Sequence, residues 1–318
     1  MPRPAVSLLG TSYRRIPLLA IGRDIYLDTR LILSKLESLF PPSAKHPPLS
    51  SNSPQHKTAE KLLEHWVIDN GLFNHAAALI PSDMPLLKDE KFRRDREDYT
   101  GRSWSRENID KGRPEALVEI RGAFGFLEES VLGDGREWVL GNGEGLTLAD
   151  IEGMWFYSRC WRGRGLMRFF FGCLAVWPFH WLKGLKGSLP PEYISAKQFP
   201  RTFAWIERFN DVVMGAMKEN GKAKAVTGPE ADEKIGSEGF AEEEANVDES
   251  DPTGLKKGEM VEVWPIDSGF SRKDRGKLVG LSTREVVIEG RMEGGGEVRI
   301  HCPRHGFRVR RLKGGERL

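Results

Sequence analysis

The feature that most constrains the fold is a strand–turn–strand–helix unit close to the start of the chain. The apolar run Leu18–Ile21 predicts a strand, and a glycine-containing turn leads into a second strand over residues 25–27. A helix is expected to open at Asp28, because leucines then recur near helical spacing until a proline pair ends the run. These signals predict a small α/β unit over residues 1–41.

The pattern becomes helical over residues 55–222. Apolar side chains recur at helical spacing in three separate stretches, which predicts amphipathic helices packed around a shared core. Thr147 and Asp150 are expected to form a capping box, in which the hydroxyl would accept the N–H of Asp150 and the carboxylate would reach back to the N–H of Thr147. Residues 156–176 interrupt the helical pattern and are interpreted as an insertion.

An acidic stretch separates the helical region from a small β unit. Residues 223–255 are rich in Glu and Asp and poor in apolar residues, so we expect a disordered acidic linker. Over residues 256–318, short apolar runs are punctuated by glycines, which predicts a small β domain of the half-closed SH3-like kind. The chain as a whole is expected to be an α+β multi-domain protein.

Composition limits the compartment and the partners. The 48 Lys and Arg nearly balance the 46 Asp and Glu, so the bulk charge favours no particular partner. Three cysteines without metal-like spacing fit a reducing compartment, and the start of the chain lacks a signal-peptide layout. The apolar run at 169–179 is too short for a membrane span, which leaves a helical hairpin or attachment to a membrane surface. We therefore expect a cytoplasmic protein that does not cross a membrane.

The order of these features resembles a known family. An Ile16-Pro17 pair ahead of a strand, an Asp28-Thr29 pair at the start of a helix and the later capping box resemble the fungal glutathione S-transferase-like proteins. The resemblance implies a partial thioredoxin-like unit, an all-helical domain of the transferase type and an appended small β module. It also implies glutathione, as a substrate, and a small electrophile as partners, and it allows a homodimer.

The resemblance implies a residual glutathione site made of Arg15, Ile16, Pro17, Asp28 and Thr29. A cis bond before Pro17 would turn the backbone N–H and C=O of Ile16 outward, where an extended peptide can pair with them. Arg15 would meet the glycyl carboxylate. At the helix start, Asp28 would accept from the γ-glutamyl ammonium and Thr29 would donate to the γ-glutamyl carboxylate. An edge-strand proline and a simple helix cap are the structural alternatives.

The catalytic turn of that family has no counterpart here. In the transferases, a hydroxyl or thiol at the first strand–helix junction holds the glutathione thiol as a thiolate. Fourteen residues precede Arg15, and we expect a truncated gene model that leaves the strand at 18–21 with an unpaired edge. The upstream hydroxyls resemble the segment before the cis-proline strand and not the catalytic turn; they are Ser7, Thr11, Ser12 and Tyr13. The chain is expected to be transferase-like but inactive, with a non-catalytic binding or interaction protein as the alternative.

Three further groups of residues carry weaker signals. His301, Cys302 and His305 look like metal ligands, but no second ligand group lies nearby in the sequence, so no metal is expected. An electrophile site in the helical domain could involve Asp69, Phe73 and Trp104.

The last of these groups is the basic end of the chain, formed by Arg304, Arg308, Arg310, Arg311, Lys313 and Arg317. Nucleic-acid binding by this tail is a third alternative, but Phe307 is the one aromatic residue among these cations. A solvated face that pairs with the acidic linker is the favoured interpretation.

Overall fold

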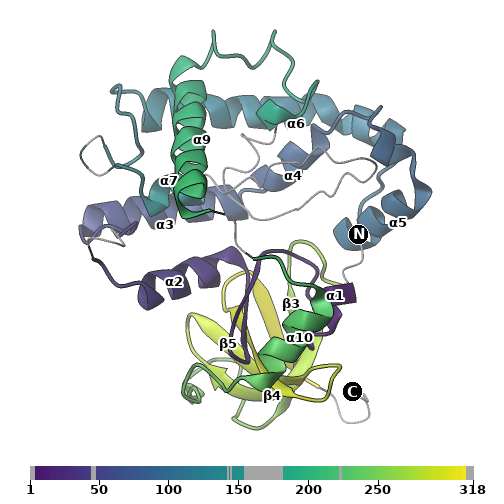
Figure 1. Ribbon diagram of the computed structural model, residues 1–318. Helices are drawn as coiled ribbons and strands as arrows, with labels where there is room; N and C mark the ends of the chain where they lie inside the picture. The colour runs from purple at the N-terminus through teal and green to yellow at the C-terminus, as the bar shows by residue number, and fades with distance from the viewer. Residues whose placement is uncertain are drawn as a thin grey trace. The chain divides into compact units, whose positions relative to one another are not determined.

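The structure, a computed structural model, describes residues 4–43, 48–141, 143, 145–153, 182–221 and 224–312. These residues form two compact units that draw on segments distant in the sequence (Figure 1). The sheet unit comprises Met1–Leu36, Lys91–Ser103 and Lys224–Leu318, and the helical unit comprises Glu37–Glu90 and Trp104–Ala223. The expected insertion at 156–176 lies outside the described residues.

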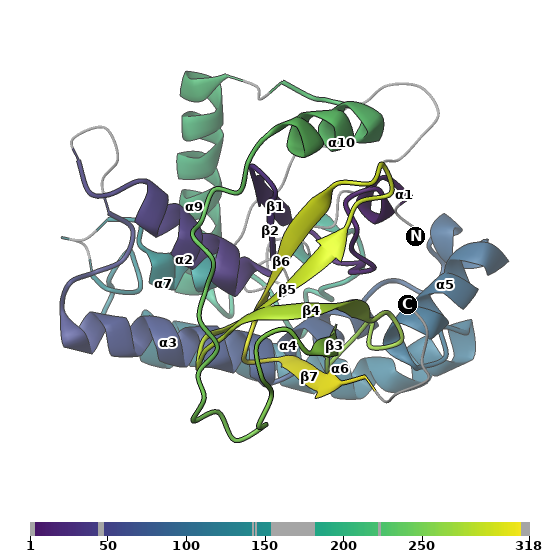
Figure 2. The ribbon, with the colours of Figure 1, turned by 90° about the horizontal axis from the view of Figure 1, so that it is seen from below.

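The sheet unit is built on one seven-stranded sheet with the order β1-β2-β6-β5-β4-β3-β7. Its strands are β1 (Leu18–Ile21), β2 (Asp24–Leu27), β3 (Met260–Pro265), β4 (Asp274–Leu281), β5 (Glu285–Arg291), β6 (Glu297–Pro303) and β7 (Phe307–Arg311). The helices that lie wholly or mainly in it are α1 (Pro4–Ser7), α2 (Thr29–Leu39), α5 (Glu90–Thr100) and α10 (Gly228–Ser237). β2 and β6 run parallel, and the other pairs run antiparallel. Strands from the two ends of the chain therefore share one sheet, purple beside yellow in Figure 2.

One hydrophobic core holds the sheet unit together and takes residues from both ends of the chain. Ile25 of β2 is fully buried together with Val261 of β3 and Ile300 of β6. A two-stranded hairpin is marginally stable in water, so β1 and β2 depend on the pairing of β2 with β6. The strands and the small β module occur where they were predicted. The division into separate domains at 1–41 and 256–318 is wrong, because the two segments bury one common core.

The acidic stretch at 223–255 is also different from the prediction. In place of a disordered linker it contains helix α10, which begins with a capping box formed by Thr227 and Glu230. Two of its few apolar residues, Ile235 and Val247, pack against the core of the sheet unit. The composition argument fails here because a small number of apolar side chains suffices when they meet a surface that is already formed.

The helical unit is made of α3 (Pro54–Asp69), α4 (Leu72–Ala78), η1 (Pro85–Lys88), α6 (Arg106–Phe126), η2 (Leu127–Val131), α7 (Leu148–Gly153) and α9 (Pro200–Asn220). α3 packs on α7, α4 on α6, and α9 on η2. Phe124 and Trp205 lie fully buried in its core. No helix in the described part of the chain is both long enough and apolar enough to cross a membrane. The expected all-helical domain is therefore present, and together with the sheet unit it gives the α+β multi-domain class that was predicted.

Asp150 joins the centre of the helical unit. One carboxylate oxygen accepts from the N–H of Thr147 at 3.1 Å, which is the reach-back half of the predicted capping box. The Thr147 hydroxyl donates to the same oxygen at 2.9 Å instead of accepting from the helix. The other oxygen accepts from the Trp205 indole at 2.8 Å and from the Val139 N–H at 2.9 Å. Burial raises the pKa of Asp150, and these bonds oppose the rise. Asp150 therefore has a structural role, because it links the start of α7 to Val139 and to Trp205 of α9.

Candidate functional site

The structure brings together the five residues that were predicted to form a ligand site. The Ile16–Pro17 peptide bond is cis, as expected. β1 and β2 pair antiparallel with Leu18 opposite Leu27, so the residues before β1 lie across from Asp28 and Thr29 after β2. An ion pair of 3.8 Å between the Arg15 guanidinium and the Asp28 carboxylate follows from this register. We call this group the corner.

Asp28 already has partners in its own chain. The residue has a φ of +69°, a left-handed conformation that Asp tolerates better than most residues. One carboxylate oxygen accepts from the Tyr13 hydroxyl at 3.3 Å, and the other accepts from the N–H of Arg30 at 3.3 Å. Asp28 and Thr29 are both buried. The carboxylate therefore caps the start of α2, which was the structural alternative to a ligand contact.

Arg15 is held by the loop between β3 and β4, which covers residues 266–273. Its guanidinium donates to the Asp267 carboxylate and to the Ser268 carbonyl oxygen, the latter at 2.8 Å. Burial alone would lower the pKa of Arg15, but Tyr13 and the nearby carboxylates outweigh it and raise the pKa. The cation expected to meet a ligand carboxylate thus meets one supplied by the protein.

Two of the hydroxyl-bearing residues upstream of the corner, Tyr13 and Thr11, contact the C-terminal strands. Tyr13 is buried, and its ring stacks on Phe307 of β7 with 5.8 Å between the ring centroids. The buried Thr11 hydroxyl donates to Asp274 at 2.8 Å. Phe307 and Asp274 both come from the C-terminal strands. Sequence reasoning missed these partners, because nothing near residues 11–15 indicates which distant strands will contact them.

A second cluster lies where β2 meets β6; the sequence drew attention to His301 and Cys302 but did not indicate their carboxylate partners. His301 is buried between two carboxylates, with Nε2 2.9 Å from Asp24 and Nδ1 2.6 Å from Glu285. Burial lowers the pKa of His301, but the two carboxylates outweigh it and raise the pKa. Both ring nitrogens thus face carboxylates, and burial raises the pKa of the neighbouring Cys302 thiol well above its ordinary value. The arrangement favours a structural role over metal binding.

This cluster also binds the acidic segment. Burial would raise the pKa of Asp24, but its bonds to His301 and to the N–H groups of Ala241 and Glu242 hold it below the ordinary value. The Tyr26 hydroxyl donates to the Glu242 carboxylate at 2.6 Å, and its ring stacks on His301 at 4.5 Å. The cluster therefore joins three segments of the chain: β2, β6 and the acidic stretch.

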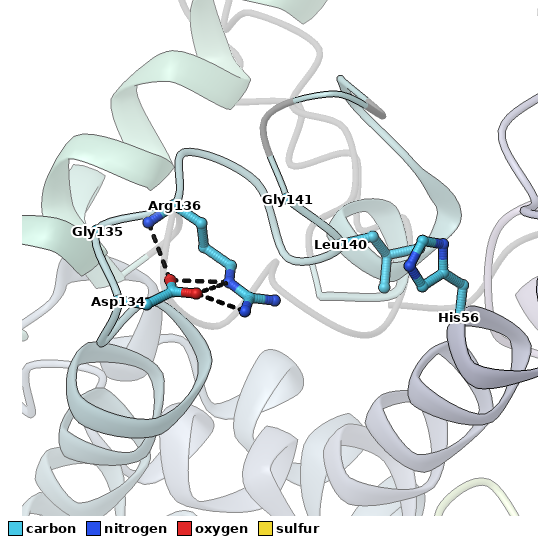
Figure 3. Close-up of a pocket in the computed structure, with 6 residues that line it drawn as sticks. All are labelled: His56, Asp134, Gly135, Arg136, Leu140 and Gly141. Carbon is cyan, nitrogen blue, oxygen red and sulfur yellow. Dashed lines mark hydrogen bonds and ion pairs between the residues drawn. The ribbon is translucent and has the colours of Figure 1, made fainter.

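An open depression of about 470 Å³ lies in the helical unit (Figure 3). Its charged residues face each other: Arg136 donates from its guanidinium and from its backbone N–H to Asp134. These bonds lower the pKa of Asp134 to about 2. The lining residues are His56, Asp134, Gly135, Arg136, Leu140 and Gly141.

The depression does not include the residues predicted to line an electrophile site. Asp69, Phe73 and Trp104 are absent from its lining, and Asp69 instead lies 2.6 Å from the His65 ring on α3. An electrophile site that involves these three residues stays a prediction.

Comparison with solved structures agrees with this architecture. A GST-like protein from Pseudomonas syringae is 21% identical to this chain with a TM-score of 0.58, and the match covers 98% of this chain and 87% of that one. The fold is GST-like. This agrees with the fold class inferred from the Ile16-Pro17 and Asp28-Thr29 pairs.

The family described as "Domain of unknown function (DUF7962)" matches residues 75–167 and 171–218. Most of this stretch belongs to the helical unit of the GST-like fold, and it includes much of the segment interpreted as an insertion. No curated protein matches the chain.

Proposed function

We propose that this GST-like protein acts by binding and not by glutathione conjugation, and that its corner docks the protein's own β3–β4 loop in place of glutathione. One observation carries the proposal: the Arg15 guanidinium donates to Asp267 and to the Ser268 carbonyl. A glutathione carboxylate would have to displace the Asp267 carboxylate from the Arg15 guanidinium.

The intramolecular carboxylate has an advantage over a free ligand. A tethered group competes at an effective concentration in the millimolar range or above, so free glutathione must exceed that concentration to displace it. The Arg15 side chain is 12% exposed and that of Asp267 is 47% exposed, so the ion pair is partly shielded from solvent and stronger than one in open solvent. Asp28, the second expected ligand contact, already accepts hydrogen bonds from the Tyr13 hydroxyl and from the backbone N–H of Arg30.

The test measures glutathione binding by isothermal titration calorimetry at up to about 10 mM ligand, above the effective concentration of the loop. We expect no saturable binding to the wild-type chain. Asp267→Asn, which removes the competing charge and keeps the size of the side chain, is expected to allow weak binding that Arg15→Ala abolishes. Asp83→Asn is the matched control, because Asp83 is an exposed aspartate of the helical unit.

A parallel assay follows conjugation of a chlorodinitrobenzene-type electrophile. The expected rate equals the uncatalysed rate for the wild type and for Asp267→Asn. Wild-type binding with a submillimolar Kd, or turnover above the uncatalysed rate, would contradict the proposal. Binding to Asp267→Asn alone would show that the loop excludes a ligand that the corner can still hold.

A further inference from the structure

The outer surface of β4, β3 and β7 carries cations around the Glu262 carboxylate and Trp264. Side chains alternate across a strand, so Val261 and Val263 point into the core while Glu262 and Trp264 point outward. The register sets Arg275 and Arg310 on either side of Glu262, and Arg308 opposite Trp264. We call this surface the cationic face; its members are Glu262, Trp264, Lys273, Arg275, Lys277, Arg308 and Arg310.

Glu262 organises the centre of the cationic face. Its carboxylate lies 2.8 Å from the Lys273 ammonium, 2.7 Å from the Arg310 guanidinium and 3.8 Å from that of Arg275. The Glu262 side chain is 1% exposed, whereas those of the three cations are 31%, 48% and 36% exposed. Burial would raise the pKa of Glu262, but Lys273 and Arg310 lower it, so the carboxylate stays ionised. One negative charge therefore holds three cations and leaves a positive surplus facing solvent.

Trp264 supplies an aromatic ring within this charge. The Lys273 ammonium lies 4.2 Å and the Arg310 guanidinium carbon 5.8 Å from the ring centroid, and the residue is partly exposed. Arg308, its cross-strand neighbour, is exposed and has no ion pair with the residues that the structure describes. Phe307, the aromatic residue next to these cations in the sequence, is instead buried against Tyr13.

The acidic segment pairs with other cations. Arg304 contacts Asp251 at 3.2 Å, and Lys257 contacts Glu244 at 3.0 Å. The expectation that the basic tail pairs with the acidic stretch therefore holds for Arg304. No carboxylate of that stretch, in the portion that the structure describes, forms an ion pair with Arg308 or Arg310.

We propose that the cationic face binds single-stranded nucleic acid. Clustered Lys and Arg side chains supply the phosphate contacts, and a partly exposed aromatic ring beside them supplies a surface on which a base can stack. An acidic peptide would use the same cations but would gain nothing specific from Trp264, which is why the aromatic ring favours nucleic acid.

The test uses fluorescence anisotropy of a labelled oligothymidylate with the full chain at several salt concentrations. The double variant Lys277→Ala/Arg308→Ala removes the two cations that do not contact Glu262, so the central ion pairs remain. Arg291→Ala is the matched control, because Arg291 is an exposed cation of the same sheet outside the cationic face. Trp264→Ala and Trp264→Phe separate stacking from charge, and thermal unfolding of every variant checks that it folds.

We expect wild-type affinity to fall as salt rises, with each lost phosphate contact reducing the logarithmic slope by about 0.7. The double variant should bind on the order of tenfold more weakly than Arg291→Ala. Trp264→Ala should lose roughly fivefold or more in affinity, and Trp264→Phe should retain most of it. Three results would overturn the proposal: no wild-type binding at low salt, a double variant equal to its control, or displacement by a polyglutamate peptide with no dependence on Trp264.

Discussion

The contact between Asp24 and His301 provides the sharpest test of how the two ends of the chain are joined. The Asp24 carboxylate accepts from His301 Nε2 at 2.9 Å and from the N–H groups of Ala241 and Glu242 at 2.6 Å and 3.1 Å. Asp24→Ala would leave the buried His301 imidazole, whose pKa the two carboxylates raise, with one carboxylate, that of Glu285, and both backbone N–H groups without their acceptor.

The expected cost follows from this arrangement. Removing one partner of a buried ion pair costs about 3–5 kcal/mol, because the other charge stays buried without compensation. This is a large part of the roughly 5–15 kcal/mol by which a typical domain is stable. We therefore expect Asp24→Ala to unfold the sheet unit at a clearly lower urea concentration than the wild type. Asp24→Asn, which keeps the size of the side chain and loses its charge, should lie between the two.

The assay is urea unfolding followed by circular dichroism, together with hydrogen exchange of peptides from β2 and from residues 238–247. The exchange measurement shows which part of the sheet unit is destabilised, because both regions should lose protection from exchange together. Asp134→Ala is the control, because it removes an exposed aspartate that is hydrogen-bonded to Arg136, and it should leave the stability unchanged. Wild-type stability of Asp24→Ala, or an equal loss in Asp134→Ala, would refute this account.

The remaining predictions concern protonation, the helical unit and thiol chemistry. The pKa of His301 is raised above 6.5, so its stabilising contribution is complete below pH 6.5 and is lost as the pH rises through the raised value. Urea unfolding as a function of pH should show this loss of stability. His301→Gln should abolish this part of the pH dependence. Asp150→Ala should destabilise the helical unit by roughly 3 kcal/mol in thermal unfolding, because buried N–H donors are left without an acceptor at about 1–3 kcal/mol each. In a Cys160→Ser/Cys173→Ser background, Cys302 should react with Ellman's reagent only after denaturation; rapid reaction of the native chain would contradict its burial and raised pKa.

Local sequence patterns predicted the elements of this protein well. The strand at Leu18–Ile21, the turn after it and the helix that follows Asp28 all depend on residues a few positions apart. The same holds for the reach of Asp150 back to Thr147. Each depends on short-range periodicity or on a side chain bonding to a nearby backbone group, which neighbouring residues largely determine.

The partners of the predicted corner could not be predicted in this way. Arg15, Pro17 and Asp28 lie together as expected, but Asp267 and Phe307 reach them through strands more distant in the sequence. A loop carboxylate carries no local signal that it will bind a particular arginine. For this reason the corner was interpreted as open to a ligand, although the chain itself engages it.

The amino-acid sequence by itself determined the two kinds of architecture, α/β at the start and helical in the middle, through the spacing of apolar residues and the placement of turns. Tertiary structure alone decided that the first and last strands share one sheet and that His301 lies between Asp24 and Glu285. It also decided that Trp264 lies between a cation of the β3–β4 loop and one of β7. The reason is that strand pairing is selected by the burial of whole apolar faces. That free energy is summed over residues far apart in the chain, so no single stretch of sequence contains it.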